Sequence, residues 1–168
     1  VEGMFSYLDV SLVLFAAMVF MKVIEANGLL AELTRGLIAR LGGSRLLLLV
    51  GLTLVIMFPG MITGSCTASV LGTGVIVAPV LMRMGLPRAT TGAVVSSAAV
   101  YGMIAPPVNV PVMIIGGGID MPYVGFGVVL AVLTIGPAVL TTLWLAWRQI
   151  DRRKLAEVVA ESRRGLAA

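Results

Sequence analysis

The stretch that decides the fold is LLLLVGLTLVIMFPGMITGSCTASVLGTGVIVAPVLM, residues 46–82. It has two apolar arms, Leu46–Pro59 and Val70–Met82, which flank the small and polar run GMITGSCTAS at Gly60–Ser69. Each arm has about 14 residues and would span about 21 Å as a helix, whereas the hydrocarbon core of a bilayer is roughly 30 Å thick. The arms are therefore predicted to be membrane-embedded helices that stop short of a full crossing.

The whole chain has the composition of an integral membrane protein. Of its 168 residues, 59% are hydrophobic and 12% are charged, against about 25% charged residues in soluble domains. Its single cysteine, Cys66, and its lack of histidine exclude an intrachain disulfide, a zinc cluster and catalysis by histidine. We expect an all-α integral membrane protein whose transmembrane helices accompany one re-entrant helical hairpin and one broken helix.

Further helices are expected on both sides of the hairpin. Before it, an apolar helix at Leu8–Ala26 ends near Gly28, with Lys22 and Glu25 at a solvated helix end, and an amphipathic helix at Leu29–Leu41 lies in the membrane interface. The expected segments after it are a helix at Ala89–Ile104, a break at Pro106–Pro111, a short continuation at Val112–Ile115, a turn at Gly116–Asp120, a span at Tyr123–Trp147 and a charged helical tail at Gln149–Arg164.

The basic residues indicate how the chain crosses the membrane. All 12 Lys and Arg residues lie before residue 46, at positions 83 and 88, or after residue 147. Because basic loops remain on the cytoplasmic side, we expect an outside N-terminus, a cytoplasmic arm before residue 46 and a cytoplasmic tail. Residues 46–82 must then enter and return, as a re-entrant hairpin or as two full spans, and the arm length favours the hairpin. This topology explains the basic composition without nucleic acid as a partner.

The hairpin tip and the broken helix offer polar groups at membrane depth, where irregular backbone occurs only under cover of protein or water. The candidate binding residues are Thr63, Gly64, Ser65, Thr67 and Ser69 at the tip and Pro106, Pro107 and Asn109 at the break. Hydroxyl, amide and carbonyl oxygens suit a hard cation such as sodium, with Ser65 and Asn109 as candidate ligands. Half-helix N-termini suit an anionic substrate. No carboxylate is expected in the membrane interior, which favours sodium over protons as the coupling ion.

Each of these features alone also fits a packing role. Gly60-x-x-x-Gly64 is a small-xxx-small motif, Ser and Thr in helices bond to their own backbone, and Pro106–Pro107 fits a kink. Together, in a hairpin and a broken helix adjacent in sequence, they favour transport. An enzyme is not expected, because the chain has neither a G-x-S-x-G elbow with a histidine base nor a P-loop.

Two longer runs resemble the large membrane subunit of TRAP (tripartite ATP-independent periplasmic) transporters of the C4-dicarboxylate type. They are FPGMITGSCTASVLGTGVIVAPVLMRMG, residues 58–85, and AVVSSAAVYGMIAPPVNVPVMI, residues 93–114. The matching positions are Gly64, Ser65, Ala68, Gly74, Pro79, Arg83 and Gly85 in the hairpin, and Gly102, Ile104, Pro106 and Pro107 in the broken helix. Ser69 stands where the family has Thr, and Ala105 and Val108 depart from the pattern. The family's Ser is lost at Val108, and Asn109 is the expected substitute.

The resemblance covers about Leu8–Trp147 and implies a sodium-coupled importer of organic acids that works as an elevator. It implies a bacterial or archaeal cytoplasmic membrane, a small membrane subunit and a periplasmic substrate-binding protein as partners. The implied parts are a scaffold helix and cytoplasmic arm at 1–45, a transport-domain hairpin and broken helix at 46–118, a transmembrane helix at 119–148 and a basic cytoplasmic tail at 149–168.

The family is built from two inverted halves, and the chain matches one of them. It also begins at Val1 rather than Met, so we expect it to be part of a longer protein. Two other interpretations stay open at this point. One is a citrate- or gluconate-like anion carrier of the same ion-transporter superfamily that works without a binding protein. The other is a non-transporting membrane scaffold held together by glycine packing.

Overall fold

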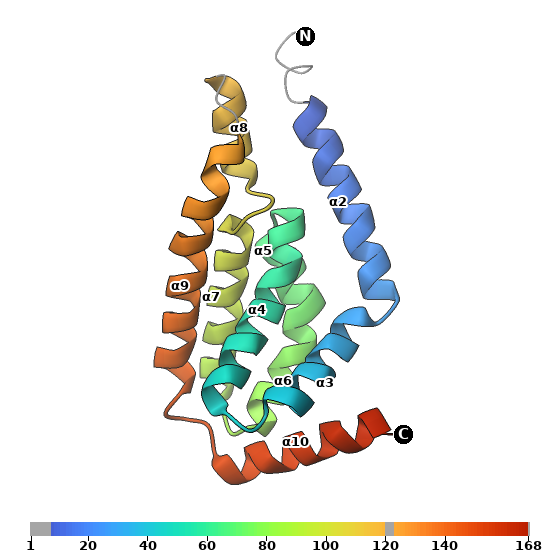
Figure 1. The fold of residues 1–168 in the computed structure, drawn as a ribbon, viewed down its shortest axis with the longest axis vertical. Coiled ribbons are helices and arrows are strands. Elements are labelled where there is room, and N and C mark those ends of the chain that lie inside the picture. The colour runs from blue at the N-terminus through green and yellow to red at the C-terminus, as the bar shows by residue number, and fades with distance from the viewer. Residues whose placement is uncertain (1–7, 120–122, 168) are drawn as a thin grey trace.

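The architecture is a bundle of helices, seen in a computed structural model that describes residues 8–119 and 123–167 (Figure 1). Their bounds are α2 Leu8–Ala26, α3 Leu29–Leu41, α4 Arg45–Thr63, α5 Cys66–Ser69, η1 Val70–Gly74, α6 Val75–Arg83, α7 Arg88–Ile104, α8 Val110–Gly118, η2 Tyr123–Phe126, α9 Gly127–Ala146 and α10 Arg152–Ala167. Three helical segments within this part of the chain are long and apolar enough to cross a membrane: Arg45–Thr63, Cys66–Arg83 and Gly127–Ala146. The prediction of an all-α membrane protein is confirmed.

The first two helices have the predicted bounds. Gly28 adopts a left-handed conformation with φ 68° between them, and the chain turns there by 63°. Leu30, Thr34 and Ile38 are buried at a spacing of four residues, so they form the face of α3 that points into the bundle. The bend at Gly28 thus lets α3 pack against α4 while α2 stands beside the hairpin.

The hairpin is present, but its arms are longer than predicted. The run Gly60–Ser69 does not form a loop: α4 continues to Thr63, the next helix begins at Cys66, and only Gly64 and Ser65 form the turn. The arms have 19 and 18 residues, or about 28 and 27 Å at 1.5 Å per residue. The expectation that the arms are too short to cross a membrane is therefore wrong, because the polar residues are accommodated inside helices.

The helix after the hairpin is broken as predicted, but over a shorter stretch. It ends at Ile104 and resumes at Val110, so Pro111 lies in the first turn of α8 rather than in the break. The predicted turn at Gly116–Asp120 is also wrong for its glycines, because Gly116–Gly118 complete α8. Asp120 lies outside the described residues.

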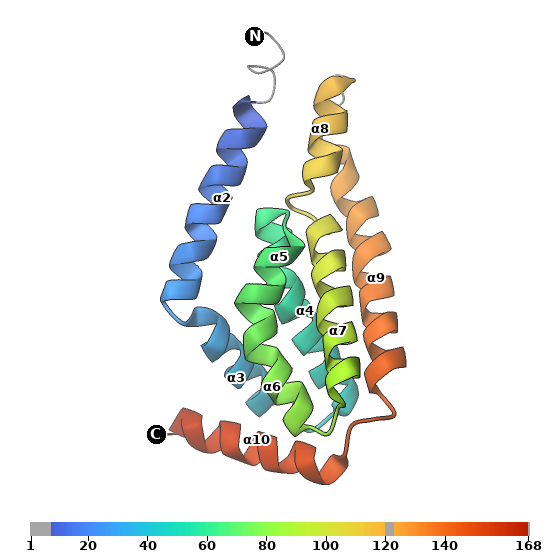
Figure 2. The same ribbon diagram turned by 180° about the vertical axis from the view of Figure 1, so that it is seen from behind.

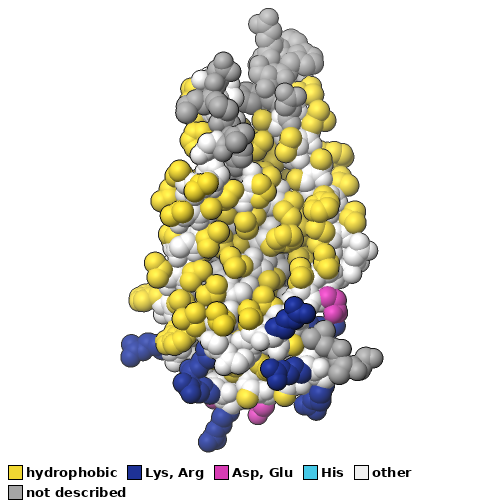
Figure 3. Space-filling model, viewed as in Figure 1, with side chains coloured by type: hydrophobic (Ala, Val, Ile, Leu, Met, Phe, Trp, Pro, Cys, Tyr) yellow, Lys and Arg dark blue, Asp and Glu magenta, His cyan; other side chains and the backbone are white. Residues whose placement is uncertain are grey.

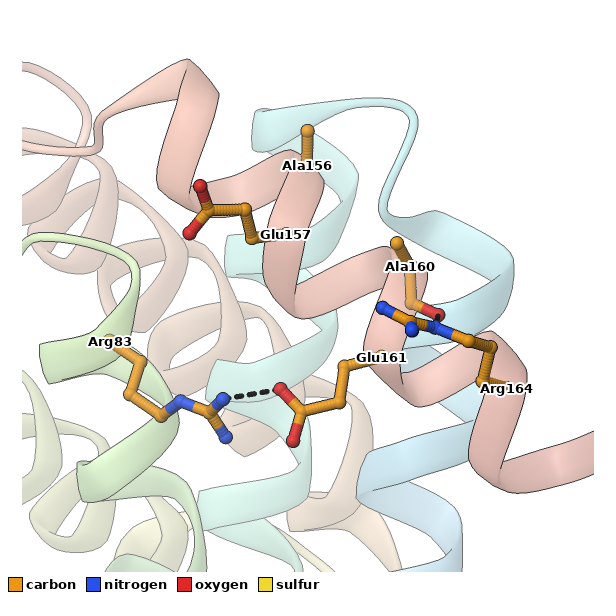
Figure 4. A pocket seen from close by; sticks show the side chains of 6 residues that line it. All are labelled: Arg83, Ala156, Glu157, Ala160, Glu161 and Arg164. Atoms are coloured by element: carbon orange, nitrogen blue, oxygen red, sulfur yellow. Dashed lines mark hydrogen bonds and ion pairs between the residues drawn. The ribbon is translucent and has the colours of Figure 1, made fainter.

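The last helix does not extend into solvent as a free tail. Leu155, Val158 and Val159 of α10 are buried in the same apolar core as α4, α6 and α7. Figure 2 shows α10 crossing the end of the bundle beneath α3 and α6. Arg83 at the end of α6 forms an ion pair with Glu161 of α10 (Figure 4), and the Arg163 guanidinium donates to the carbonyl of Ala39 at 3.1 Å.

The charge distribution matches this arrangement. Figure 3 shows apolar side chains over the body of the bundle, whereas Lys and Arg side chains gather at the end where α10 lies. We call this the basic end. An apolar body with a cationic end is the surface expected of a membrane protein whose α10 lies against the lipid headgroups.

Candidate functional site

The hairpin tip and the break between α7 and α8 lie at the same level of the bundle, and α2 and α8 extend beyond both (Figure 1). The backbone N–H of Val108 in the break donates to the carbonyl of Met61 near the tip at 3.1 Å. A Cβ on Gly64 would lie 2.6 Å from Cγ2 of Val110. The structure therefore brings the two breaks together. It places them inside the bundle rather than at its end.

The turn at the tip depends on Gly64. Its φ of 64° is left-handed, and its N–H donates to the carbonyl of Gly60 at 2.7 Å, which closes α4. Ser65 follows in extended backbone and starts the second arm. Its N–H donates to the hydroxyl of Thr63 at 3.3 Å.

Two of the predicted hydroxyl ligands have structural roles. The Thr63 hydroxyl donates to the carbonyl of Pro59 at 2.8 Å. The Ser69 hydroxyl accepts from the N–H of Gly60 at 2.7 Å and is fully buried. These bonds satisfy polar groups within the apolar hairpin, which explains why the polar run remains helical.

The other predicted hydroxyls at the tip face a pocket. The pocket has a volume of about 290 Å³ and lies between α2 and the hairpin. Its lining residues are Met18, Met21, Lys22, Glu25, Thr63, Ser65, Thr67, Ala68, Leu71 and Gly72. Ser65 and Thr67 are thus at a cavity that a small polar species could enter, whereas Ser69 is not among its lining residues.

Glu25 is a residue of this pocket that the sequence argument missed. It was expected at a solvated helix end, but its side chain is only 23% exposed and pairs with Lys22 at 2.8 Å. Its Oε1 lies 2.7 Å from where a Cβ on Gly72 would stand. Gly72 belongs to a π-helical segment, a feature frequent at functional sites.

Glu25 lies in the last turn of α2 and faces Gly72 of the hairpin. A carboxylate thus borders the pocket, while the absence of carboxylates from the membrane interior stays a prediction. The spacing of Lys22 and Glu25, three residues apart near the end of an apolar helix, was the signal for a paired carboxylate.

Asn109 joins the two halves of the broken helix. Its amide nitrogen donates to the carbonyl of Ile104 at the end of α7 at 2.7 Å. Its amide oxygen accepts from the N–H of Val112 at 3.1 Å and caps α8. Its side chain is 3% exposed, so capping is a role that the structure assigns to it.

The predicted site residues therefore form two groups. Ser65 and Thr67 line the pocket beside α2, together with Thr63, whereas Pro106, Pro107 and Asn109 are not among its lining residues. Pro106 and Pro107, joined by a cis peptide bond, lie on the break that contacts the tip through Val108. Among the described residues, no group of three or more His, Cys, Asp or Glu side chains could hold a metal ion. A cation here would bind hydroxyls, carbonyls and a single carboxylate.

Comparison with known proteins gives one match. The family model described as "Tripartite ATP-independent periplasmic transporter, DctM component" matches residues 2–167. Neither the search of curated proteins nor the search of solved structures finds a match. The matched range includes the hairpin, the broken helix and α10.

Proposed function

Because this chain belongs to the DctM component family of tripartite ATP-independent periplasmic transporters, we propose that it forms the permease of a sodium-coupled importer of organic acids. The observation that carries the proposal is the meeting of the hairpin tip with the α7–α8 break inside the bundle. In transporters, discontinuous helices of this kind present helix termini and carbonyl groups to substrates and ions near the middle of the membrane.

The proposed ion site uses Ser65 and Asn109, as the sequence suggested, with different roles. In this proposal Ser65, which lines the pocket, is a direct ligand. Asn109 acts indirectly: it ties the end of α7 to the start of α8 through its two backbone partners, and so holds the break that contacts the tip through Val108. Thr67 and Glu25 add a hydroxyl and a carboxylate on the α2 side, which are oxygen ligands suited to sodium.

An elevator mechanism is supported by how the elements pack. A Cβ on Gly102 of α7 would lie 2.6 Å from the carbonyl oxygen of Met57 in α4, so these two helices touch through their backbones and move as one body. α2 meets the hairpin through side chains only: Met21 and Ile24 belong to a small apolar cluster with Phe58, Ile62 and Ile76, and a pocket lies beside them. We propose that α4–α8 form the moving part and that α2 and α3 belong to the scaffold.

The remaining parts of the proposal follow from the family. The permease works in the cytoplasmic membrane of a bacterium or archaeon, with the basic end in the cytoplasm. Its partners are a small membrane subunit and a periplasmic substrate-binding protein that delivers the organic acid.

Transport by single-site variants tests the site. Sodium-dependent uptake is measured in proteoliposomes that contain the complete transporter together with its binding protein. Ser65→Ala and Asn109→Ala should each reduce uptake at least tenfold. Ser97→Ala is the matched control, because the Ser97 hydroxyl only bonds the carbonyl of Val94 in its own helix. Normal uptake by both site variants would show that the site is assigned wrongly.

Cysteine labelling separates a transporter cavity from a glycine-packed scaffold. In a Cys66→Ala background, Ser65→Cys and Thr67→Cys should react with a water-soluble thiol reagent, because both positions line the pocket. Ser69→Cys should stay unreactive, since Ser69 is fully buried. Equal inertness at all three positions would favour the scaffold.

A further inference from the structure

A depression separate from the pocket at the hairpin tip lies at the basic end, where three segments of the chain meet. It has a volume of about 440 Å³ and is formed by the α3–α4 turn, the end of α9 and the start of α10. Its lining residues are Gly42, Gly43, Ser44, Arg45, Trp147, Arg152, Leu155 and Ala156. We call it the Arg45–Arg152 depression. It shares no residue with the pocket at the hairpin tip, so the proposed transport function does not account for it.

The charged residues that line this depression are all positive. It contains two guanidinium groups and no carboxylate. The nearest acid along the chain, Asp151, accepts from the N–H of Arg153 at 2.9 Å. Within the described ranges, neither Arg45 nor Arg152 has a carboxylate at ion-pairing distance, whereas Arg83 pairs with Glu161 (Figure 4). A ligand at this site is therefore expected to be an anion.

The two guanidinium groups retain donors for such a ligand. Arg45 uses Nη1 to donate to the carbonyl of Ile150 at 3.2 Å, which holds its side chain in place. A guanidinium has five N–H donors, so the others remain for an acceptor. Planar pairs of donors suit the oxygens of a phosphate, which arginine binds in a bidentate manner.

An apolar strip continues from the depression along α9. Trp147 lines the depression, and Trp144 and Leu140 lie on the same helix face one and two turns further along. They are 82% and 69% exposed. In a membrane protein this face lies among acyl chains, and tryptophans mark the level of the headgroups. The combination of a cationic depression and an adjoining apolar strip matches an amphiphile.

We propose that the Arg45–Arg152 depression binds the headgroup phosphate of an anionic phospholipid, whose acyl chains lie along α9. A lipid with a net negative charge is preferred over a zwitterionic lipid, because the lining supplies two positive charges and no negative one. The bound lipid connects the α3–α4 turn to α9 and α10. This inference does not depend on what the protein transports.

Native mass spectrometry of the purified chain in detergent tests the proposal. Phosphatidylglycerol and phosphatidylethanolamine with identical acyl chains are titrated separately, and phosphatidylglycerol should bind at least tenfold more tightly. Arg45→Gln/Arg152→Gln should remove this preference. Arg35→Gln/Arg164→Gln, which lowers the net charge equally at positions outside the depression, should retain it. The proposal is overturned if both double variants lose the preference equally or if neither does.

Two further measurements keep the result interpretable. Arg45→Gln also removes the bond to Ile150, so Arg152→Gln alone, with folding monitored by circular dichroism, should weaken phosphatidylglycerol binding at least threefold in a folded protein. An unchanged affinity in that variant contradicts the site. Glycerol phosphate, which lacks acyl chains, should not displace the bound lipid at equal concentration. Displacement would contradict the role of the α9 strip.

Discussion

At the scale of single residues, Gly64 is a position where the backbone conformation and the neighbouring atoms both require glycine. An L-residue at φ 64° is strained, and a Cβ there would lie 2.6 Å from Cγ2 of Val110. We expect Gly64→Ala to lower the free energy of unfolding by about 1–3 kcal/mol, measured by denaturant titration in detergent. Gly36→Ala in α3 is the control, because nothing lies within 4 Å of a Cβ there, and it should be neutral or slightly stabilising.

Asn109 offers a second prediction at this scale. Asn109→Ala removes the cap of α8 and the donor to the carbonyl of Ile104, so it should destabilise the protein by roughly 1–3 kcal/mol. Asn109→Ser keeps a neutral acceptor for the N–H of Val112 but loses the donor to Ile104, and should fall between Asn and Ala. A Ser variant less stable than the Ala variant would contradict the capping role.

The sequence showed the polar residues of the site but not their partners. Ser65 and Thr67 were found because hydroxyls between two apolar arms are conspicuous. Ser69 accepts from the N–H of Gly60, whereas Thr67 lines the pocket. Which of the two faces the pocket depends on how the second arm is rotated about its axis. The π-helical segment at Val70–Gly74 alters that rotation. Glu25 was missed because its surroundings are set by residues about 40 positions later in the chain.

At the scale of elements, α4 and α7 cross with their backbones in contact. A Cβ on Gly102 would lie 2.6 Å from the carbonyl oxygen of Met57 and 2.8 Å from its Cα. Because backbone cannot yield as a side chain does, Gly102→Ala should destabilise the protein by about 3 kcal/mol. Gly92→Ala in the same helix meets nothing within 4 Å and should raise stability by roughly 0.5–1 kcal/mol. Equal melting temperatures for the two variants would contradict the crossing.

Element bounds were predictable where the chain itself supplies a stop signal. Gly28 ends α2 and Gly42 follows α3, and both helices have the predicted limits. Limits failed where composition was taken as a stop signal. Thr63 stays helical, with its hydroxyl bonded to the carbonyl of Pro59 one turn earlier, and Gly116–Gly118 stay helical despite the low intrinsic helix preference of glycine.

At the scale of the whole molecule, α10 closes the basic end. The sequence shows Leu155, Val158 and Val159 at helical spacing, and the prediction of a charged helical tail did not include their burial in the core. We expect Val159→Asp to lower the free energy of unfolding by roughly 2–4 kcal/mol, because it places an unpaired charge in the core. Ala160→Asp, one position further on the exposed face, should change it by less than about 0.5 kcal/mol. A matching loss in both variants would show that α10 does not pack as described.

The hydrogen bond from Arg163 to Ala39 also bears on the order in which the chain folds during synthesis. The two residues are 124 positions apart in the chain, and a ribosome adds about 5–20 residues per second. Roughly 6–25 s therefore pass between the synthesis of α3 and the synthesis of the helix that covers it. The hairpin can enter the bilayer during this interval. The bond between α3 and α10, however, cannot form until α10 has been synthesised. Membrane insertion and completion of the fold are thus separate events, and the second can occur only after α10 has been synthesised.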